Sequence, residues 1–325
     1  MDAEVEITPL AADRPFGCVT PRRAGIGLLD WVAGRRALLD DWLAVRGALL
    51  FRGFADQSAL ALGDFMAAVG GELMAYRYRS TPRTLVGDRV YTATEYPRDH
   101  AIPLHNENAY QRIWPNRLAF QCVEPATRGG RTPIAFMPAV TWRIGAALFE
   151  EFTSRQVLYV RNYGLGVDLP WQTVFQAEDR GEVEAFCRMQ GIVTEWGEDG
   201  CLRTRQVCQG SGRHPVTGEP LWFNQAHLFH ISSLPEPVRE DLLALFDASD
   251  LPRNAFFGDG AALDMDALDR VRAAFAAESF AFDWQAGDVL LLDNMLVAHG
   301  RESFEGSRRV LVAMGAPNGE PPLKT

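Results

Sequence analysis

The segment "IPLHNENAYQRIWP", residues 102–115, places His105 and Glu107 two positions apart in a stretch that is typical of a β-strand. Residues i and i+2 of a strand point to the same face, so the two side chains could give one metal ion two adjacent ligands. A third ligand must come from elsewhere, and His299 is the most suggestive candidate because it lies between two apolar strand-like segments. Two histidines and one carboxylate on one face of an octahedral ion form the ligand set of non-haem Fe(II) oxygenases.

A cationic side chain near the end of the chain could serve the same chemistry. In "RRVLVAMG", Arg309, Leu311 and Ala313 share one face of the predicted strand, and Arg308 and Val310 lie on the other. If Arg309 begins an inward-facing row, its guanidinium needs an anion and could bind the far end of a dicarboxylate through two hydrogen bonds. The competing interpretation, which spacing alone favours, is a strand-end arginine whose head reaches solvent.

The strands that would position these residues fall into two groups. The first extends from residue 90 to about 136, and the second, after residue 280, contains "FAFDW", "GDVLLLDN" and "RRVLVAMG". The earliest helical pattern covers residues 28–43. We expect one domain spanning residues 1–325, with an insertion at about 140–235 between the two groups of core strands. Sheets assembled from distant segments favour a sandwich or jelly roll, mainly β with flanking helices, over a regular βαβ alternation.

Composition narrows the classes of partner. The 325 residues include 42 acidic and 32 basic side chains, for a net charge of −10, whereas nucleic-acid-binding surfaces concentrate positive charge. No apolar run reaches the roughly 18 residues that span a bilayer, and "MDAEVEITPL" lacks the pattern of a signal peptide. The five cysteines never form CxxC, which is typical of reduced thiols in a cytoplasmic protein and disfavours a thiolate metal site. We therefore expect a cytoplasmic protein with a small-molecule partner, no nucleic acid and no membrane.

Five motifs together resemble the taurine dioxygenase-like (TauD/TfdA) family of Fe(II)- and 2-oxoglutarate-dependent oxygenases. They are "RGALLFRGF", "LHNENAY", "EPATRGGRTPIAFM", "WFNQAHLFH" and "GDVLLLDNMLVAHGRESFEGSRRVLVAM", and they extend from about residue 46 to residue 314. The chain looks closest to the branch similar to the syringomycin-pathway hydroxylase. The family fold is a double-stranded β-helix, which is a jelly roll with flanking helices, and this agrees with the two groups of strands.

The resemblance implies specific roles. His105, Glu107 and His299 would ligate Fe(II), while Arg309 and Thr132 would bind the distal carboxylate of 2-oxoglutarate. No catalytic residue beyond the metal ligands is implied, and O2 is the remaining cosubstrate.

Two departures bear on the substrate. Taurine dioxygenase has aspartate where this chain has Glu107, and its sulfonate-binding arginine would fall at Ala313. A taurine-like sulfonate is therefore not expected. Halogenases of the wider class replace the carboxylate with a small residue, and Glu107 argues against that activity here.

The branch implies hydroxylation of an unactivated C–H bond of an amino acid, free or presented by an acyl or peptidyl carrier protein, in antibiotic or other natural-product biosynthesis. Desaturation or cyclisation with the same cofactors is an open alternative. A catalytically silent jelly-roll module and a hydrolytic zinc enzyme are alternatives of other classes. Retention of all three ligands together with Arg309 favours the oxygenase.

Candidate substrate-binding residues come from three places in the chain. The basic segment "AYRYRSTPR" could hold a substrate carboxylate or could be a solvated loop; Arg79 is its favoured member, because the substrate pocket of the family draws on this region. Glu95 and Asn108 flank the ligands and could meet a substrate amine or amide, and Asn224 could offer a pocket amide. His227 and His230 have H-x-x-H spacing, but their apolar neighbours favour packing.

Overall fold

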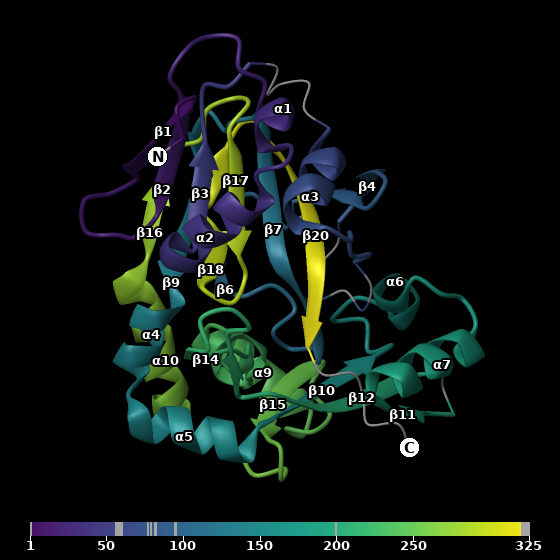
Figure 1. Ribbon diagram of the computed structural model, residues 1–325. Coiled ribbons are helices and arrows are strands. Elements are labelled where there is room, and N and C mark those ends of the chain that lie inside the picture. Colours follow the sequence, from purple (N-terminus) through teal and green to yellow (C-terminus); the bar gives the residue numbers. More distant parts are fainter. Residues whose placement is uncertain are drawn as a thin grey trace.

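The computed structural model describes residues 2–55, 61–76, 78, 80, 83–93, 96–198 and 200–319. Two β-sheets form its upper part (Figure 1). The major sheet has eight strands in the order β1 (Val5–Pro9), β2 (Gly17–Pro21), β3 (Ala48–Phe51), β17 (Val289–Asp293), β7 (Ile113–Glu124), β20 (Arg309–Gly319), β5 (Val90–Thr92) and β4 (Leu85–Gly87). The minor sheet has the order β16 (Phe280–Phe282), β9 (Thr132–Phe136), β18 (Val297–Arg301) and β6 (Ile102–His105).

The facing sides of the two sheets share one hydrophobic core. Leu118, Phe120 and Val312 of the major sheet belong to the same buried cluster as Ile134 and Val297 of the minor sheet. Strands that pair within each sheet come from distant parts of the chain, as when β7 lies between β17 and β20. This arrangement is a jelly roll of the double-stranded β-helix type, and the predicted fold class, mainly β with flanking helices, is confirmed.

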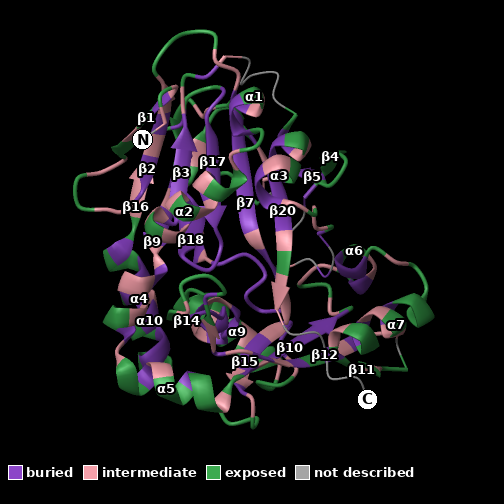
Figure 2. Cartoon of the chain, viewed as in Figure 1, coloured by how far each residue is buried: buried purple, intermediate pink, exposed green. Residues whose placement is uncertain are grey.

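Three helices cover the outer face of the major sheet. They are α1 (Leu28–Val32), α2 (Arg36–Arg46) and α3 (Leu62–Gly70), and Figure 1 shows them in front of β3, β17 and β7. A second buried cluster joins Leu39 and Phe65 of these helices to Leu49, Leu291 and Ala313 of the sheet. The central strands are consequently buried on both faces (Figure 2).

The segment between β9 and β16 forms the lower part of the molecule in Figure 1. It contains a four-stranded antiparallel sheet in the order β11 (Val193–Trp196), β12 (Leu202–Cys208), β10 (Val157–Tyr163) and β15 (Arg253–Phe257), and a hairpin of β13 (Ser211–Arg213) and β14 (Pro220–Trp222). Its helices are α4 (Met137–Ile144), α5 (Ala146–Arg155), α6 (Trp171–Phe175), α7 (Arg180–Gln190), α8 (Ala226–Phe229), the 3-10 helix η2 (Ile231–Ser233), α9 (Glu236–Leu245) and α10 (Met265–Glu278). The short strands β8 (Arg128–Gly129) and β19 (Phe304–Glu305) pair beside the sandwich.

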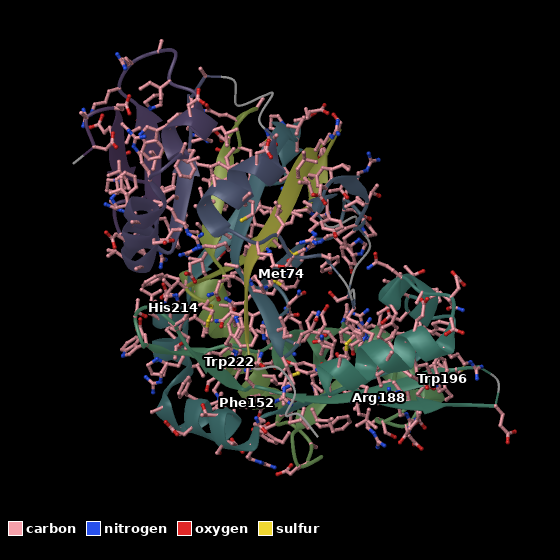
Figure 3. All side chains as sticks on the ribbon, turned by 45° about the vertical axis from the view of Figure 1, so that its right-hand side comes forward. Met74, Phe152, Arg188, Trp196, His214 and Trp222 are labelled. Carbon is pink, nitrogen blue, oxygen red and sulfur yellow. The ribbon has the colours of Figure 1, made fainter. Side chains whose placement is uncertain are left out.

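This intervening segment is longer than the sequence suggested. We expected an insertion ending near residue 235, but α9, β15 and α10 also precede β16, so the segment extends from Met137 to Ser279. Figure 3 shows Trp222 beside Phe152, and their rings lie 4.6 Å apart between centroids.

Within the described residues, no helix combines the length and the apolar character needed to cross a membrane.

Candidate metal centre and its surroundings

The structure brings together the three side chains that the sequence singled out as metal ligands. His299 is the cross-strand partner of His105, because β18 pairs antiparallel with β6, and their ring centroids lie 4.5 Å apart. Glu107 follows the end of β6 in a turn, so it is not on the strand itself as the spacing suggested. Its Oε2 nevertheless lies 3.7 Å from Nε2 of His299. Ligand atoms of all three residues lie within 4.8 Å of one another, and no other group of this kind occurs among the described residues.

The chemistry of these donors fits a divalent metal ion. Nδ1 of His105 lies 2.8 Å from the Pro103 carbonyl oxygen, an arrangement in which Nδ1 carries the proton and Nε2 keeps its lone pair for a metal. Burial, together with neighbouring His299, lowers the pKa of His105 to about 4, so the imidazole is neutral near pH 7. Burial alone would raise the pKa of Glu107, but the positive charge of Arg83 holds it well below its ordinary value. Both groups are therefore in the deprotonated form that ligation requires.

One amide joins the two parts of the site. Oδ1 of Asn294 accepts a hydrogen bond from the Glu107 amide at 2.7 Å, and its Nδ2 donates to the carbonyls of Glu107 at 2.9 Å and Pro115 at 2.8 Å. The side chain of Asn106 donates back to the Asn294 carbonyl at 2.6 Å. Asn294 lies in the turn before β18, which carries His299. Asn294 therefore links the turn that precedes one ligand to the backbone of the carboxylate ligand.

The preceding residue, Asp293, anchors the same turn. Its carboxylate accepts hydrogen bonds from Arg117 at 2.7 Å and from the backbone amides of Met295 and Leu296. Nε2 of His214 lies 3.1 Å from the same carboxylate, and Figure 3 shows His214 where the lower part meets the sandwich. This buried network fastens the turn before β18 to both parts of the molecule.

The carboxylate of Glu107 has a partner that the sequence did not identify individually. NH2 of Arg83 donates to Oε2 of Glu107 at 2.7 Å, and the two side chains are 3% and 4% exposed. The guanidinium also lies over the ring of Tyr76, 4.5 Å from its centroid. Arg83 was only one member of the predicted basic cluster, and no local pattern distinguishes it, because its partner lies in a different loop.

Of the two orientations that the sequence left open for Arg309, the structure has the solvent-facing one, which spacing alone favoured, and not the inward one. Its side chain is exposed at the start of β20. Val310 and Val312 belong to the core between the two sheets, whereas Leu311 and Ala313 pack against the outer helices. The row that contains Arg309 therefore faces away from the interior of the sandwich.

Arg308 lies beside Thr132 instead. Its Nε donates to the Gly130 carbonyl at 2.9 Å, and its NH2 is 3.5 Å from the hydroxyl oxygen of Thr132. Nε1 of Trp284 donates to the same hydroxyl at 3.0 Å. Burial, with a smaller contribution from nearby Arg301, lowers the pKa of Arg308 to about 10, which still leaves the guanidinium charged at neutral pH. The half-buried guanidinium of Arg308 and the hydroxyl of Thr132 thus lie side by side, an arrangement suited to a carboxylate.

The motif "GGRT" has a steric role next to this arginine. Gly130 has φ +69°, a backbone conformation that favours glycine. A Cβ at this position would lie 3.0 Å from Cδ of Arg308 and 2.9 Å from Cβ of Ala126. Glycine therefore lets the arginine approach the strand that carries Thr132.

The four predicted substrate-binding residues have different outcomes. Arg79 and Glu95 lie outside the described residues. Asn108 is buried with φ +56°, and among the described residues its Oδ1 has no hydrogen-bond partner. The amide of Asn224 bonds the backbone, donating to the Gly210 carbonyl at 2.6 Å and accepting from the Ala226 amide at 3.0 Å, which fixes its orientation.

The histidines of the H-x-x-H segment pack as the sequence suggested. The ring of His227 stacks on Phe275, with centroids 4.7 Å apart and planes 17° from parallel. Nδ1 of His230 lies 2.8 Å from the hydroxyl oxygen of Ser232. Burial lowers the pKa of His227 to about 3 and that of His230 to about 4.

The jelly roll carries two histidines on neighbouring strands of its minor sheet and a carboxylate in the adjoining turn. This fold and this set of ligands define the class of non-haem iron oxygenases. The chain belongs to the taurine catabolism dioxygenase TauD, TfdA family, whose sequence model matches residues 6–314. It is a dioxygenase that uses Fe(II) and 2-oxoglutarate.

Two relatives are similar over most of their length. The dapdiamide synthesis protein DdaC of Enterobacter agglomerans is 42% identical over 279 residues, which cover 86% of this chain and 85% of the relative. A clavaminate synthase-like protein of Arabidopsis thaliana is 35% identical over 289 residues, covering 85% and 83%.

Solved structures share the fold at lower identity. PvcB from Pseudomonas aeruginosa has a TM-score of 0.56 at 19% identity, covering 97% of this chain and 92% of PvcB. The structure of AAD-2 in complex with Mn(II) and N-oxalylglycine has a TM-score of 0.57 at 14% identity, covering 98% and 99%.

Proposed function

We propose that the enzyme hydroxylates an unactivated C–H bond of an amino acid, free or bound to a carrier protein, in a natural-product pathway. The name of the relative DdaC, a dapdiamide synthesis protein, supports the biosynthetic setting. The observation that carries the proposal is the convergence of His105, Glu107 and His299 within 4.8 Å.

In this proposal the three residues would hold Fe(II). With 2-oxoglutarate and O2, the bound ion would supply the oxidation of a C–H bond, coupled to release of CO2 and succinate. The protein keeps the imidazole of His105 neutral and the carboxylate of Glu107 charged. Asn294 fixes the backbone of Glu107 through hydrogen bonds at 2.7 and 2.9 Å, so that the ligands are in position before iron arrives.

Arg308, in place of Arg309, is the residue that we assign to the distal carboxylate of 2-oxoglutarate, together with Thr132. Removing part of a guanidinium from water is costly without an anion, and a carboxylate would offset that cost for the half-buried Arg308 through charge-assisted hydrogen bonds. Thr132 accepts a hydrogen bond from Trp284 at 3.0 Å, which leaves its own hydroxyl proton free to donate to the cosubstrate.

The environment of Asn108 is evidence that the substrate contains nitrogen. A buried acceptor without a partner costs about 1–3 kcal/mol, and a donor from a bound molecule would recover this energy. Oδ1 of Asn108 is such an acceptor among the described residues and lies one residue after Glu107. An amine or amide N–H of the substrate matches it, which is the chemistry of an amino acid or its amide.

The test is an aerobic incubation with Fe(II) and 2-oxoglutarate against the twenty amino acids, free and as carrier-protein thioesters. We expect one group of substrates to stimulate succinate formation and to yield a product heavier by one oxygen atom. A product lighter by two hydrogens would instead indicate desaturation or cyclisation. Absence of stimulated succinate with every substrate, from protein that binds Fe(II), would contradict the hydroxylase proposal.

A further inference from the structure

Arg83 contacts the predicted metal centre through the carboxylate of Glu107. Its NH2 lies 2.7 Å from Oε2 of Glu107, and this same oxygen lies 3.7 Å from Nε2 of His299. Both members of the ion pair are buried, so solvent screens the interaction little. The stacking of the guanidinium on Tyr76 restricts the direction from which Arg83 approaches.

The contact affects how Glu107 can bind a metal. A carboxylate can ligate through one oxygen or through both, and the second mode needs both oxygens to turn their lone pairs toward the ion. A charge-assisted hydrogen bond from Arg83 occupies a lone pair of Oε2 and stabilises an unsymmetrical carboxylate. Glutamate also has one more rotatable bond than aspartate, so its carboxylate has more orientations to restrict.

The mode of ligation decides how many positions remain for reactants. Of the six positions on an octahedral ion, two imidazoles and one carboxylate oxygen leave three, which accommodate a chelating 2-oxo acid and O2. A carboxylate bound through both oxygens would leave only two, and the 2-oxo acid alone would fill them.

We propose that Arg83 is a positioning residue that holds Glu107 as a one-oxygen ligand and so preserves the third open position. This inference rests on the proposed metal site at His105, Glu107 and His299. Arg83 does not touch the reacting atoms in this role. It acts through the carboxylate. We therefore expect the removal of Arg83 to change the number of open coordination positions on the metal more than the affinity of the protein for the metal.

The first experiment uses the parent protein and needs no variant. A crystal structure of the enzyme with Mn(II) and 2-oxoglutarate, grown without O2, should show Glu107 bound through one oxygen and Arg83 within about 3.2 Å of its carboxylate. A Glu107 bound through both oxygens, or an Arg83 withdrawn from it, would overturn the inference. An ion bound elsewhere would overturn the proposed metal site instead, so the two failures are distinguishable.

The second experiment compares Arg83→Met with Arg83→Lys, and with Arg155→Met as a matched control. Arg155 also forms an ion pair and lies over an aromatic ring, with Asp259 and Phe257, but on the surface of the lower part. Co(II) serves as the probe, because its visible spectrum reports the number and arrangement of ligands without turnover.

We expect Arg83→Met to bind Co(II) with a changed spectrum, both alone and with 2-oxoglutarate added without O2. Arg83→Lys, which keeps a cation and an N–H donor, should restore the parental spectrum in part, and Arg155→Met should match the parent. A natively folded Arg83→Met with the parental spectrum under both conditions would refute the role. If Arg83→Met does not fold, as judged by near-UV circular dichroism, the crystal structure of the parent decides alone.

Discussion

At the scale of single residues, two adjacent arginines receive different environments from one strand. Arg308 lies beside Thr132 with its side chain partly buried, whereas Arg309 is exposed at the start of β20. They have the same chemistry and differ by one position, but successive side chains of an extended chain point to opposite faces, so one cation is partly covered and the other is solvated.

This pair allows a matched test of the cosubstrate site. Arg308→Met should raise the KM for 2-oxoglutarate roughly 10- to 150-fold, because a hydrogen bond to a charged group contributes about 1.5–3 kcal/mol. Arg309→Met should leave that KM unchanged, since its head lies in solvent. Steady-state succinate formation measures both variants. An effect of Arg309→Met equal to that of Arg308→Met would remove Arg308 from the proposed role.

At the scale of elements, alternation identifies the strands but not which of their faces lies inside. Leu311 and Ala313 are apolar because helices cover the outer face of the sheet, and Val310 and Val312 are apolar because the second sheet covers the inner face. Both rows therefore look like core rows in the sequence, and the orientation of Arg309 could not be deduced from them. The pair of His105 and Glu107 was easier to find, since its spacing is local.

The turn before β18 gives a second prediction. Asn294→Ala removes hydrogen bonds to the backbone of Glu107 and Pro115 and leaves buried groups unsatisfied, so we expect a loss of about 2–4 kcal/mol in the free energy of unfolding. Weaker Co(II) binding should accompany it, because the carboxylate ligand loses its support. Urea unfolding and Co(II) titration measure the two effects.

Asn318→Ala is the control for that variant. Its amide, near the end of β20, donates to the side chains of Asn116 and Met295, and within the described part of the chain it has no hydrogen bond to the three ligands. It should change stability by less than about 1 kcal/mol and leave Co(II) affinity unchanged. Parental Co(II) affinity in Asn294→Ala would show that the amide stabilises the fold without positioning Glu107.

At the scale of the whole molecule, the intervening segment is fastened by its own charge pairs. Asp168 accepts hydrogen bonds from Arg253 of β15 at 2.6 and 2.9 Å. Burial raises the pKa of Asp168, but Arg253 and Arg161 outweigh it, so the pKa lies below its ordinary value. The pair joins the loop before α6 to the lower sheet. Its two residues are far apart in the chain, so no local sequence pattern predicts their contact.

This pair should make stability depend on pH. Because the folded-state pKa of Asp168 is below the unfolded value of about 3.9, its stabilisation is complete above that value and is lost as the pH falls through the folded-state pKa. Asp168→Asn should cost about 1–3 kcal/mol at pH 7, and its difference from the parent should shrink below about pH 4. Urea unfolding at several pH values tests this. Glu236→Gln, which alters an exposed pair with Arg239, should show no such trend.

The pairing of His299 with His105 has a consequence for how the chain folds. These two strands meet only after the whole segment from Met137 to Ser279 has been enclosed between them, and such long loops close late. A divalent ion can therefore find its complete binding site only in the nearly finished protein. Adding Co(II) should therefore slow unfolding and leave the refolding rate unchanged, and stopped-flow fluorescence measures both rates. A faster refolding phase with Co(II) would show that the ion binds before the protein is nearly folded.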